Sequence, residues 1–185
     1  MLAFYLTLVI DDDSQNKIEL IYTKYRPYMT YCAFRVLRNK SDAEDATHEA
    51  MLRIIKYIEK IDTTDLDILK HFCGRVAENT AKDLNRLQKD EAENISYSDL
   101  VVEPYSDTDT TEEYYFSHNA AEVVYQNIKL MSPTYKDICM MKFIYGLNDM
   151  EISDLLSINY KTVSSYISRG RLVLKKALKE AGYHE

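Results

Sequence analysis

The chain has 185 residues, of which 46% are hydrophobic, and it contains only four glycines and three prolines. This composition argues against wholesale disorder and, with long helical periodicities, predicts an all-α protein of one or two domains. Three widely spaced cysteines without a Cys-x-x-Cys pair indicate the reduced thiols of a cytoplasmic protein and argue against a zinc site. The apolar first ten residues are too few to span a bilayer and lead directly into three aspartates. We therefore expect them to pack on the core or on a partner.

The net charge of −7 is concentrated in one segment. Residues 1–89 hold 14 basic and 14 acidic side chains, residues 90–120 hold nine acidic and no basic ones, and residues 121–185 hold nine basic and seven acidic ones. Both flanking blocks can therefore present basic faces, and the acidic balance does not exclude a nucleic-acid partner.

Three amphipathic helices are predicted in the N-terminal block. The first covers about residues 15–37 and contains Pro27, which is expected to kink or split it. The second begins at Ser41, a capping residue with Glu44 three positions later, and ends near residue 59. The third covers about residues 65–89. Three helices of this size can bury a small core together.

Helical periodicity is lost over residues 90–118, which are rich in acidic and hydroxyl side chains and predict a flexible linker. A second helical block follows. One helix is predicted over residues 120–131, and Ser132-Pro133 starts another that ends near Gly146, because proline is favoured at the first helical position.

The C-terminal end has the layout of a helix-turn-helix. Asn148 and Glu151 form a capping box, residues 157–159 form the turn, and Asn159 caps a second helix. Between Asn159 and Lys179 there are six Lys or Arg and no acidic residue. The second helix of such a unit lies in the DNA major groove, so the sequence predicts DNA binding. The early outward positions, where base-edge contacts are made, hold Lys161, Thr162, Ser164 and Ser165.

Two charged stripes mark the N-terminal block. The second helix carries three carboxylates at i, i+3 and i+7, opposite its apolar side: Asp42, Asp45 and Glu49. The third helix carries a basic strip on one outer face, with an asparagine beside it: His71, Arg75, Asn79, Lys82, Arg86 and Lys89. Either stripe is consistent with an ordinary solvated surface, and the basic strip also fits a path along a phosphate backbone.

Together these segments resemble bacterial extracytoplasmic-function sigma factors. The segments similar to the second domain of that family are Tyr25-Arg26-Pro27, Asp42 to Glu49, and Ala77 to Leu84. Those similar to its fourth domain are Phe143 to Leu147, Glu151-Ile152, Thr162-Val163, and Ser168 to Arg171. The resemblance covers about residues 15–89 and 120–180, in the order of the family.

The resemblance implies a second sigma domain over residues 1–89, an acidic linker over 90–118, and a fourth sigma domain over 119–185. The acidic stripe would dock on the β′ clamp helices of core RNA polymerase: Asp42, Asp45 and Glu49. The loop around residues 61–65 and part of the basic strip would read and open the downstream promoter element: Arg75, Asn79, Lys82 and Arg86. The fourth domain would contact the β flap and read the upstream element through Lys161, Thr162, Ser164, Ser165, Arg169 and Arg171.

Such a protein would be no enzyme, would need no cofactor, and would give polymerase its promoter specificity, with an anti-sigma factor as an expected regulator.

Some positions depart from the family. Basic residues are sparse after Leu84, His71-Phe72 stands where Trp is common, and Ser164-Ser165 stands where Lys and Arg are common. These departures bear on the promoter sequence and the binding strength. We expect weak binding to free promoter DNA, because polymerase would supply much of the affinity.

Two other interpretations remain open. One is a stand-alone helix-turn-helix regulator whose N-terminal helices dimerise or sense a ligand. The other is a helical metalloenzyme, because Asp45 and His48 at i, i+3 resemble half of a di-iron carboxylate site, although no second copy exists. The acidic stripe beside a basic strip favours the sigma factor over the stand-alone regulator, and the missing second copy argues against the metalloenzyme.

Overall fold

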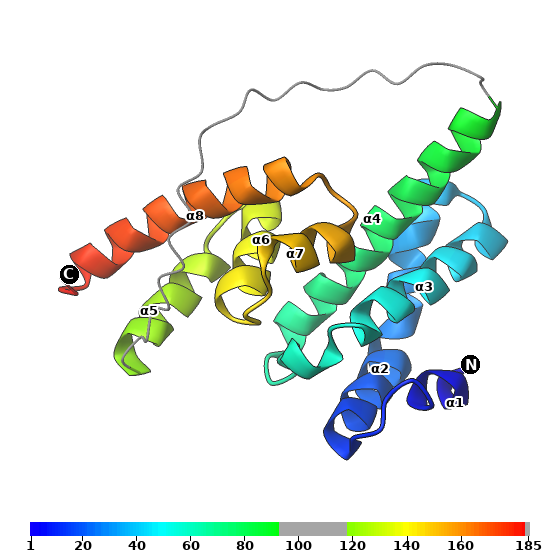
Figure 1. The fold of residues 1–185 in the computed structure, drawn as a ribbon, viewed down its shortest axis with the longest axis horizontal. Helices are drawn as coiled ribbons and strands as arrows, with labels where there is room; N and C mark the ends of the chain where they lie inside the picture. The colour runs from blue at the N-terminus through cyan, green and yellow to red at the C-terminus, as the bar shows by residue number, and fades with distance from the viewer. Residues whose placement is uncertain (93–117, 184–185) are drawn as a thin grey trace.

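The helices predicted from the sequence account for most of the fold (Figure 1). The computed structural model describes residues 1–92 and 118–183 and, within them, contains eight α-helices, one 3-10 helix and no strand. The predicted all-α fold is therefore confirmed. The elements in chain order are α1 (Leu2–Leu6), α2 (Asp12–Leu37), α3 (Lys40–Ile55), η1 (Ile58–Lys60), α4 (Leu66–Ala92), α5 (His118–Lys129), α6 (Pro133–Phe143), α7 (Asp149–Leu156) and α8 (Tyr160–Glu180).

The first two long helices differ from the prediction at their ends. α2 begins at Asp12, where the Asp11 carboxylate accepts a hydrogen bond from the backbone N–H of Ser14 at 2.7 Å, and it runs through Pro27 to Leu37 as one helix. The predicted cap of α3 at Ser41 is wrong. Asn39 has the extended backbone of a cap and accepts from the N–H of Ser41 at 2.9 Å, so Ser41 already lies in the first turn.

The predicted end of the second helix near residue 59 is also wrong. α3 ends at Ile55, and the chain tightens into η1 over Ile58–Lys60. Ile58 and Ile61 are both buried, at 2% and 1% exposure, so the chain turns to bring these two side chains into the core. The loop that follows ends at Asp65, whose carboxylate caps α4 by accepting from the N–H groups of Asp67 and Ile68, each at 3.0 Å.

The helix-turn-helix forms as its local sequence predicts. Asn148 accepts from the N–H of Glu151 at 2.9 Å, and Glu151 accepts in return from the N–H of Asn148 at 2.8 Å, which completes the capping box of α7. Ser157 adopts a left-handed backbone conformation in the turn, and Asn159 caps α8 through the N–H of Lys161. The acidic linker is predicted over residues of which 93–117 lie outside the described part of the chain, so it stays a prediction.

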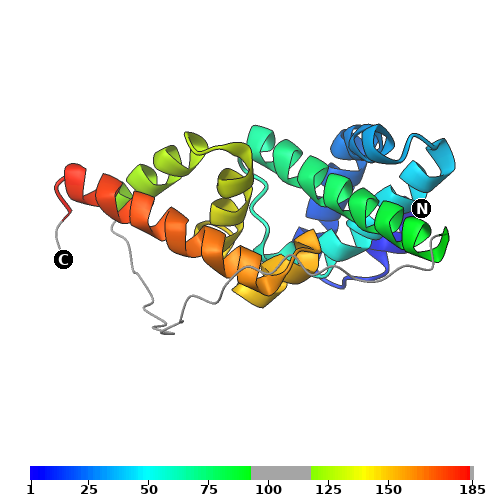
Figure 2. The same cartoon turned by 90° about the horizontal axis from the view of Figure 1, so that it is seen from above.

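The molecule consists of two halves that lie side by side (Figures 1 and 2). The N-terminal half is built from α1–α4, with α2, α3 and α4 packed on one another, and the C-terminal half from α5–α8. A short apolar segment covers the far end of the N-terminal half, where Tyr5 of α1 is buried and its hydroxyl lies 2.6 Å from Nδ1 of His48. The first ten residues were expected to pack on the core or on a partner, and in the structure they contribute to the core.

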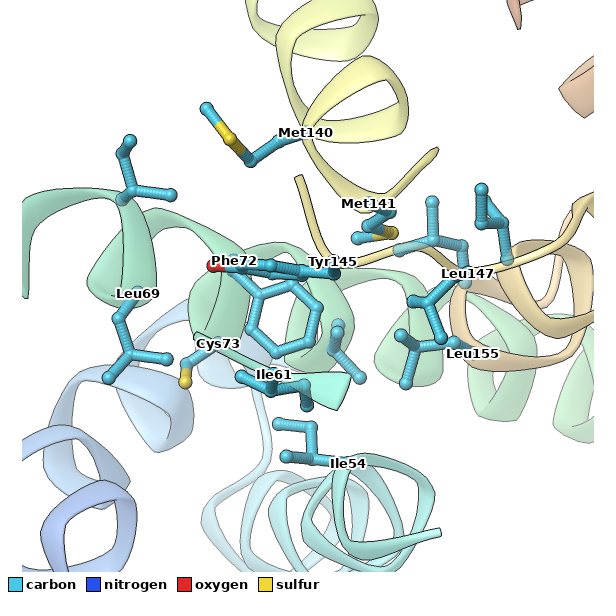
Figure 3. Packing of buried hydrophobic residues seen from close by; sticks show 14 of the residues in the cluster. Ile54, Ile61, Leu69, Phe72, Cys73, Met140, Met141, Tyr145, Leu147 and Leu155 are labelled. Atoms are coloured by element: carbon cyan, nitrogen blue, oxygen red, sulfur yellow. The ribbon is translucent and has the colours of Figure 1, made fainter. Parts of the chain in front are cut away.

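The two halves also share a single hydrophobic cluster. α4 contacts α6 and α7, and α7 also contacts α3. Figure 3 shows side chains of α3 and α4 facing Met141, Tyr145 and Leu147 from the C-terminal half. We call this shared boundary the seam.

Candidate functional site

The acidic stripe of α3 lies on the outer face of the N-terminal half. The opposite face of the helix is made of alanines that are fully buried against α2 and α4: Ala43, Ala46 and Ala50. Asp45 is exposed, whereas Asp42 and Glu49 are half-buried. Within the described residues, Glu49 pairs with Arg53 one turn along α3 at 3.1 Å, and neither Asp42 nor Asp45 forms an ion pair. The predicted stripe therefore presents two carboxylates that a cationic partner could reach.

The basic strip of α4 is interrupted by acidic residues. Lys82 lies 2.7 Å from Glu78, and Arg86 lies 3.5 Å from Asp83, although both cations remain exposed. Such exposed pairs are worth about 0.2–1 kcal/mol and give way readily to a phosphate. Asn79 is half-buried on the same helix. Lys82 and Arg86 therefore remain available to a nucleic-acid backbone. The side chain of Lys89 lies outside the described part of the chain.

Arg75 differs from the rest of the strip because it is already bound. Its Nε donates to Asp137 of α6 at 2.7 Å, and Nη1 lies 3.6 Å from Glu78. The side chain of Asp137 is only 10% exposed. The Asp137 hydrogen bond helps to raise the pKa of the Arg75 guanidinium, against the effect of burial. A predicted DNA contact is thus occupied by a carboxylate of the other half.

The predicted promoter-opening loop, residues 61–65, is also bound at its end. One oxygen of Asp65 caps α4, and the other accepts from the Tyr125 hydroxyl and from Lys129 Nζ at 3.3 Å, both on α5. The Tyr125 hydrogen bond, followed by the α4 cap, lowers the pKa of the Asp65 carboxyl to about 2. Asp65 therefore joins the loop to the C-terminal half.

The outward face of α8 is open. Val163 and Ile167 are buried, whereas Lys161, Arg169 and Arg171 are exposed. The small polar side chains between them are half-buried: Thr162, Ser164 and Ser165.

One contact holds part of this face in place. The Arg169 guanidinium donates to the Tyr135 hydroxyl of α6 at 3.3 Å, and the Tyr135 ring packs edge-on against Tyr166. The helix thus has the buried inner face and the basic outer face that a major-groove reader needs.

Comparison with known proteins gives one family match, in the N-terminal half, and two similar proteins. Residues 21–91, which cover most of α2 together with α3 and α4, match the sigma-70 region 2 family. The chain is 26% identical over 166 residues to the ECF RNA polymerase sigma factor SigW of Bacillus subtilis, which covers 84% of this chain and 86% of that protein. It is also 26% identical over 155 residues to the RNA polymerase sigma factor SigZ of the same species, with 83% and 82% covered.

The chain is therefore similar to RNA polymerase sigma factors, among them one of the extracytoplasmic-function group. A solved structure of the sigma factor RpoE of Bartonella quintana, in complex with the anti-sigma factor NepR, covers 87% of this chain and 96% of the solved chain. Its TM-score is 0.36 and its identity 13%, too low to compare how the two halves are arranged.

A basic edge at the end of α3 was not predicted from the sequence. Arg53, Lys56 and Lys60 recur at helical spacing, and each contacts the α7 region: Ser157, Asp154 and Glu151, respectively. The i, i+3, i+7 spacing of these cations was the available signal. This spacing alone does not show that the acidic face of α7 lies opposite the three cations.

Two further expectations concern a metal site at His48 and membrane-spanning helices. His48, which suggested half of a metal site, has its Nδ1 at 2.6 Å from the buried Tyr5 hydroxyl. Among residues 1–92 and 118–183, no group of three or more His, Cys, Asp or Glu side chains is arranged to hold a metal ion. No helix in the same part of the chain is long and apolar enough to cross a membrane.

Proposed function

We propose that this chain is an extracytoplasmic-function sigma factor that binds core RNA polymerase, recognises two promoter elements and directs promoter opening, acting in the cytoplasm without catalytic chemistry of its own. The observation that carries the proposal is the union, in one chain, of a sigma-70 region 2 match over α2–α4 with a capped helix-turn-helix. A stand-alone regulator would need only the helix-turn-helix. The region 2 match and the similarity to SigW therefore favour a sigma factor.

The acidic face of α3 is the proposed docking surface for the β′ clamp helices. Asp42 and Asp45 make no ion pair within the described residues, so they lose nothing when a cationic partner binds. Glu49 completes the stripe but is shared with Arg53. Because the alanine face behind them is buried, the carboxylates are held by a rigid helix.

The proposed DNA-reading surfaces lie on α4 and α8. Lys82, Arg86 and Asn79 follow one side of α4, and Arg75 completes it once its bond to Asp137 is released. On α8 the exposed cations supply phosphate contacts, and the hydroxyl side chains between them are suited to base edges. The β flap contact and an anti-sigma factor are further partners expected from the family resemblance.

The test is transcription in vitro with purified bacterial core polymerase and fragmented DNA from the source genome, with this protein added or omitted and the transcript 5′ ends mapped. We expect new start sites that share two upstream sequence elements. Absence of new transcripts, when the same core is active with another sigma factor, would refute the proposal.

Two variants locate the surfaces in the same assay. D42K/D45K should lower core affinity, whereas E19K, at an exposed position of α2, should not. K161A/R169A should weaken use of the upstream element and reduce its salt dependence, whereas K179A, at the far end of α8, is the matched control.

A further inference from the structure

The first ten residues keep an apolar face on the outside of the molecule. Within the described residues, four of the thirteen exposed large hydrophobic side chains lie among residues 1–10, and none of these ten side chains is charged. Met1, Phe4 and Leu8 recur at helical spacing and are 63%, 49% and 47% exposed. They share one side of α1 and of the turn that closes it, where the N–H of Leu8 donates to the carbonyl of Tyr5 at 3.1 Å. We call these three side chains the α1 patch.

The other side of α1 is already buried. Tyr5 is 2% exposed, and its ring packs against Tyr22 of α2 with the centroids 5.8 Å apart. Leu2 and Leu6 pack against the same core. A helix that is hydrophobic all round is normally buried on every side. α1 lies at the end of the N-terminal half that is far from α5–α8 (Figures 1 and 2), so the C-terminal half does not cover the patch. A contiguous apolar patch of this kind is typical of an interaction site.

The α1 patch borders the acidic stripe of α3. The ring centroid of Phe4 lies 6.1 Å from that of His48 on α3. His48 follows Asp45 by three positions and directly precedes Glu49, so it lies at the edge of the stripe. The Tyr5 hydroxyl, 2.6 Å from Nδ1 of His48, attaches α1 to α3 at this edge. A partner that docks on the carboxylates of α3 therefore meets the α1 patch as well.

The charges around the patch indicate the chemistry of that partner. Residues 1–16 contain no basic side chain, and Asp11, Asp12 and Asp13 are exposed directly after the patch. Carboxylates thus lie on both sides of it. An anionic membrane surface attracts helices that carry Lys and Arg, so these surroundings disfavour it. A second copy bound symmetrically would bring the same carboxylates together and be repelled. The charges favour a protein surface that is apolar and flanked by cations.

We propose that the α1 patch is a second, apolar part of the surface that binds core RNA polymerase, beside the carboxylates of the acidic stripe. This inference rests on the proposed function, because it takes the same cationic partner. The stripe contributes charge attraction, which salt weakens, whereas the patch contributes burial of apolar surface, which salt does not screen. Phe4 and Leu8 lose their remaining exposure when the partner is bound. The two parts of the surface therefore differ in their response to salt.

The experiment is a binding titration of the full-length protein with purified core polymerase, at low and at high salt. F4Q/L8Q should raise the Kd about tenfold at both salt concentrations. The matched control L130Q/M150Q removes two apolar side chains of the C-terminal half that are 85% and 65% exposed, and it should leave the Kd unchanged. The effect of D42K/D45K should instead shrink as salt is added. Circular dichroism checks that helicity and melting temperature are preserved.

A second pair of variants tests the charge of the partner at one position. F4Q also removes a ring that lies beside His48 and can loosen α1. L8K and L8E avoid this, because Leu8 is exposed and both variants lose the same apolar contact. Opposite a cationic partner, L8K should weaken binding more than L8E does. A larger loss with L8E would overturn the cationic neighbour and with it the proposal.

The outcomes separate this inference from the proposed function. If wild-type protein binds core polymerase and F4Q/L8Q, L8K and L8E all bind it equally well, the inference is overturned and the proposed function stands. If wild-type protein does not bind core polymerase, the proposed function fails and the inference fails with it. Sedimentation equilibrium and flotation with vesicles of phosphatidylglycerol and phosphatidylcholine test the other occupants. A dimer or a vesicle complex that wild-type protein forms and F4Q/L8Q does not would assign the patch to that occupant and overturn the polymerase contact.

Discussion

The substitution G170A tests how closely α8 packs against α6. A Cβ atom at position 170 would lie 2.3 Å from Sγ of Cys139, whereas ordinary contacts begin near 3.4 Å. Cys139 is fully buried, so its sulfur has little room to rotate away. Overpacking of this kind costs about 1–3 kcal/mol, and the better helix propensity of alanine returns about 0.8–1 kcal/mol. We expect G170A to lower the free energy of unfolding by up to about 2 kcal/mol, or the melting temperature by up to about 8 °C.

The companion substitution C139A makes the argument quantitative. Without the sulfur, the nearest atom to the new methyl group is the Cβ of residue 139, at 4.0 Å, which is an ordinary contact. C139A alone leaves a sulfur-sized void and should cost about 1 kcal/mol. In G170A/C139A the methyl group refills that space, so the double variant should be more stable than the sum of the single effects by about 1–3 kcal/mol.

The assay is urea unfolding followed by circular dichroism at equilibrium, with the four proteins of the cycle compared in one buffer. Additive effects within about 0.5 kcal/mol, or a G170A variant more stable than wild type, would refute the close-packing argument. Because Arg169 and Arg171 flank Gly170 on the outer face of α8, G170A should also weaken upstream-element binding, and C139A should restore it.

Three further predictions address caps, charge and docking. N148A removes the side chain that caps α7 and should lower the free energy of unfolding by about 1 kcal/mol, as measured by denaturant unfolding; an unchanged midpoint would show that the cap is not needed. The Asp65 carboxyl has its pKa lowered to about 2 in the folded protein, below the value of about 3.9 for an unfolded chain, so its contribution to stability is present above pH 4 and is lost as the pH falls towards 2. The stability difference between wild type and D65N should therefore be largest near neutral pH and shrink on acidification, and a difference that grows on acidification would contradict the pairing. D42K/D45K should reduce core polymerase affinity at least tenfold in a binding titration while E19K does not, and equal affinities would remove the docking assignment.

Local sequence signals predicted those elements whose ends are decided by neighbouring residues. The capping box of Asn148 and Glu151 and the cap at Asn159 are satisfied within three residues, so pattern alone located α7 and α8. The end of α3 was misplaced because it depends on the burial of Ile58 and Ile61, which is a property of the assembled core. The cap of α3 was misplaced because two good capping residues, Asn39 and Ser41, lie two positions apart, and Asn39 has the extended backbone.

In the candidate site, the partners of charged residues could not be predicted from local sequence either. Arg75 was predicted on an outer face of α4, but it is half-buried and its partner Asp137 lies 62 residues away along the chain. Glu151 was recognised as the local cap of α7. Its ion pair with Lys60 was not recognised, because sequence spacing gives no information about which helix lies opposite. Contacts across the seam are therefore the part of the site that required the structure.

The charges at the seam also bear on the overall acidity of the chain. Lys56 and Lys60 pair with the carboxylates of Asp154 and Glu151 on α7, whereas Arg53 pairs with Glu49 and Asp83 of its own half. The basic edge is therefore neutralised by carboxylates of the same molecule, which lowers the positive potential of the N-terminal half. Because the pairs of Lys56 and Lys60 are partly exposed, added salt weakens them.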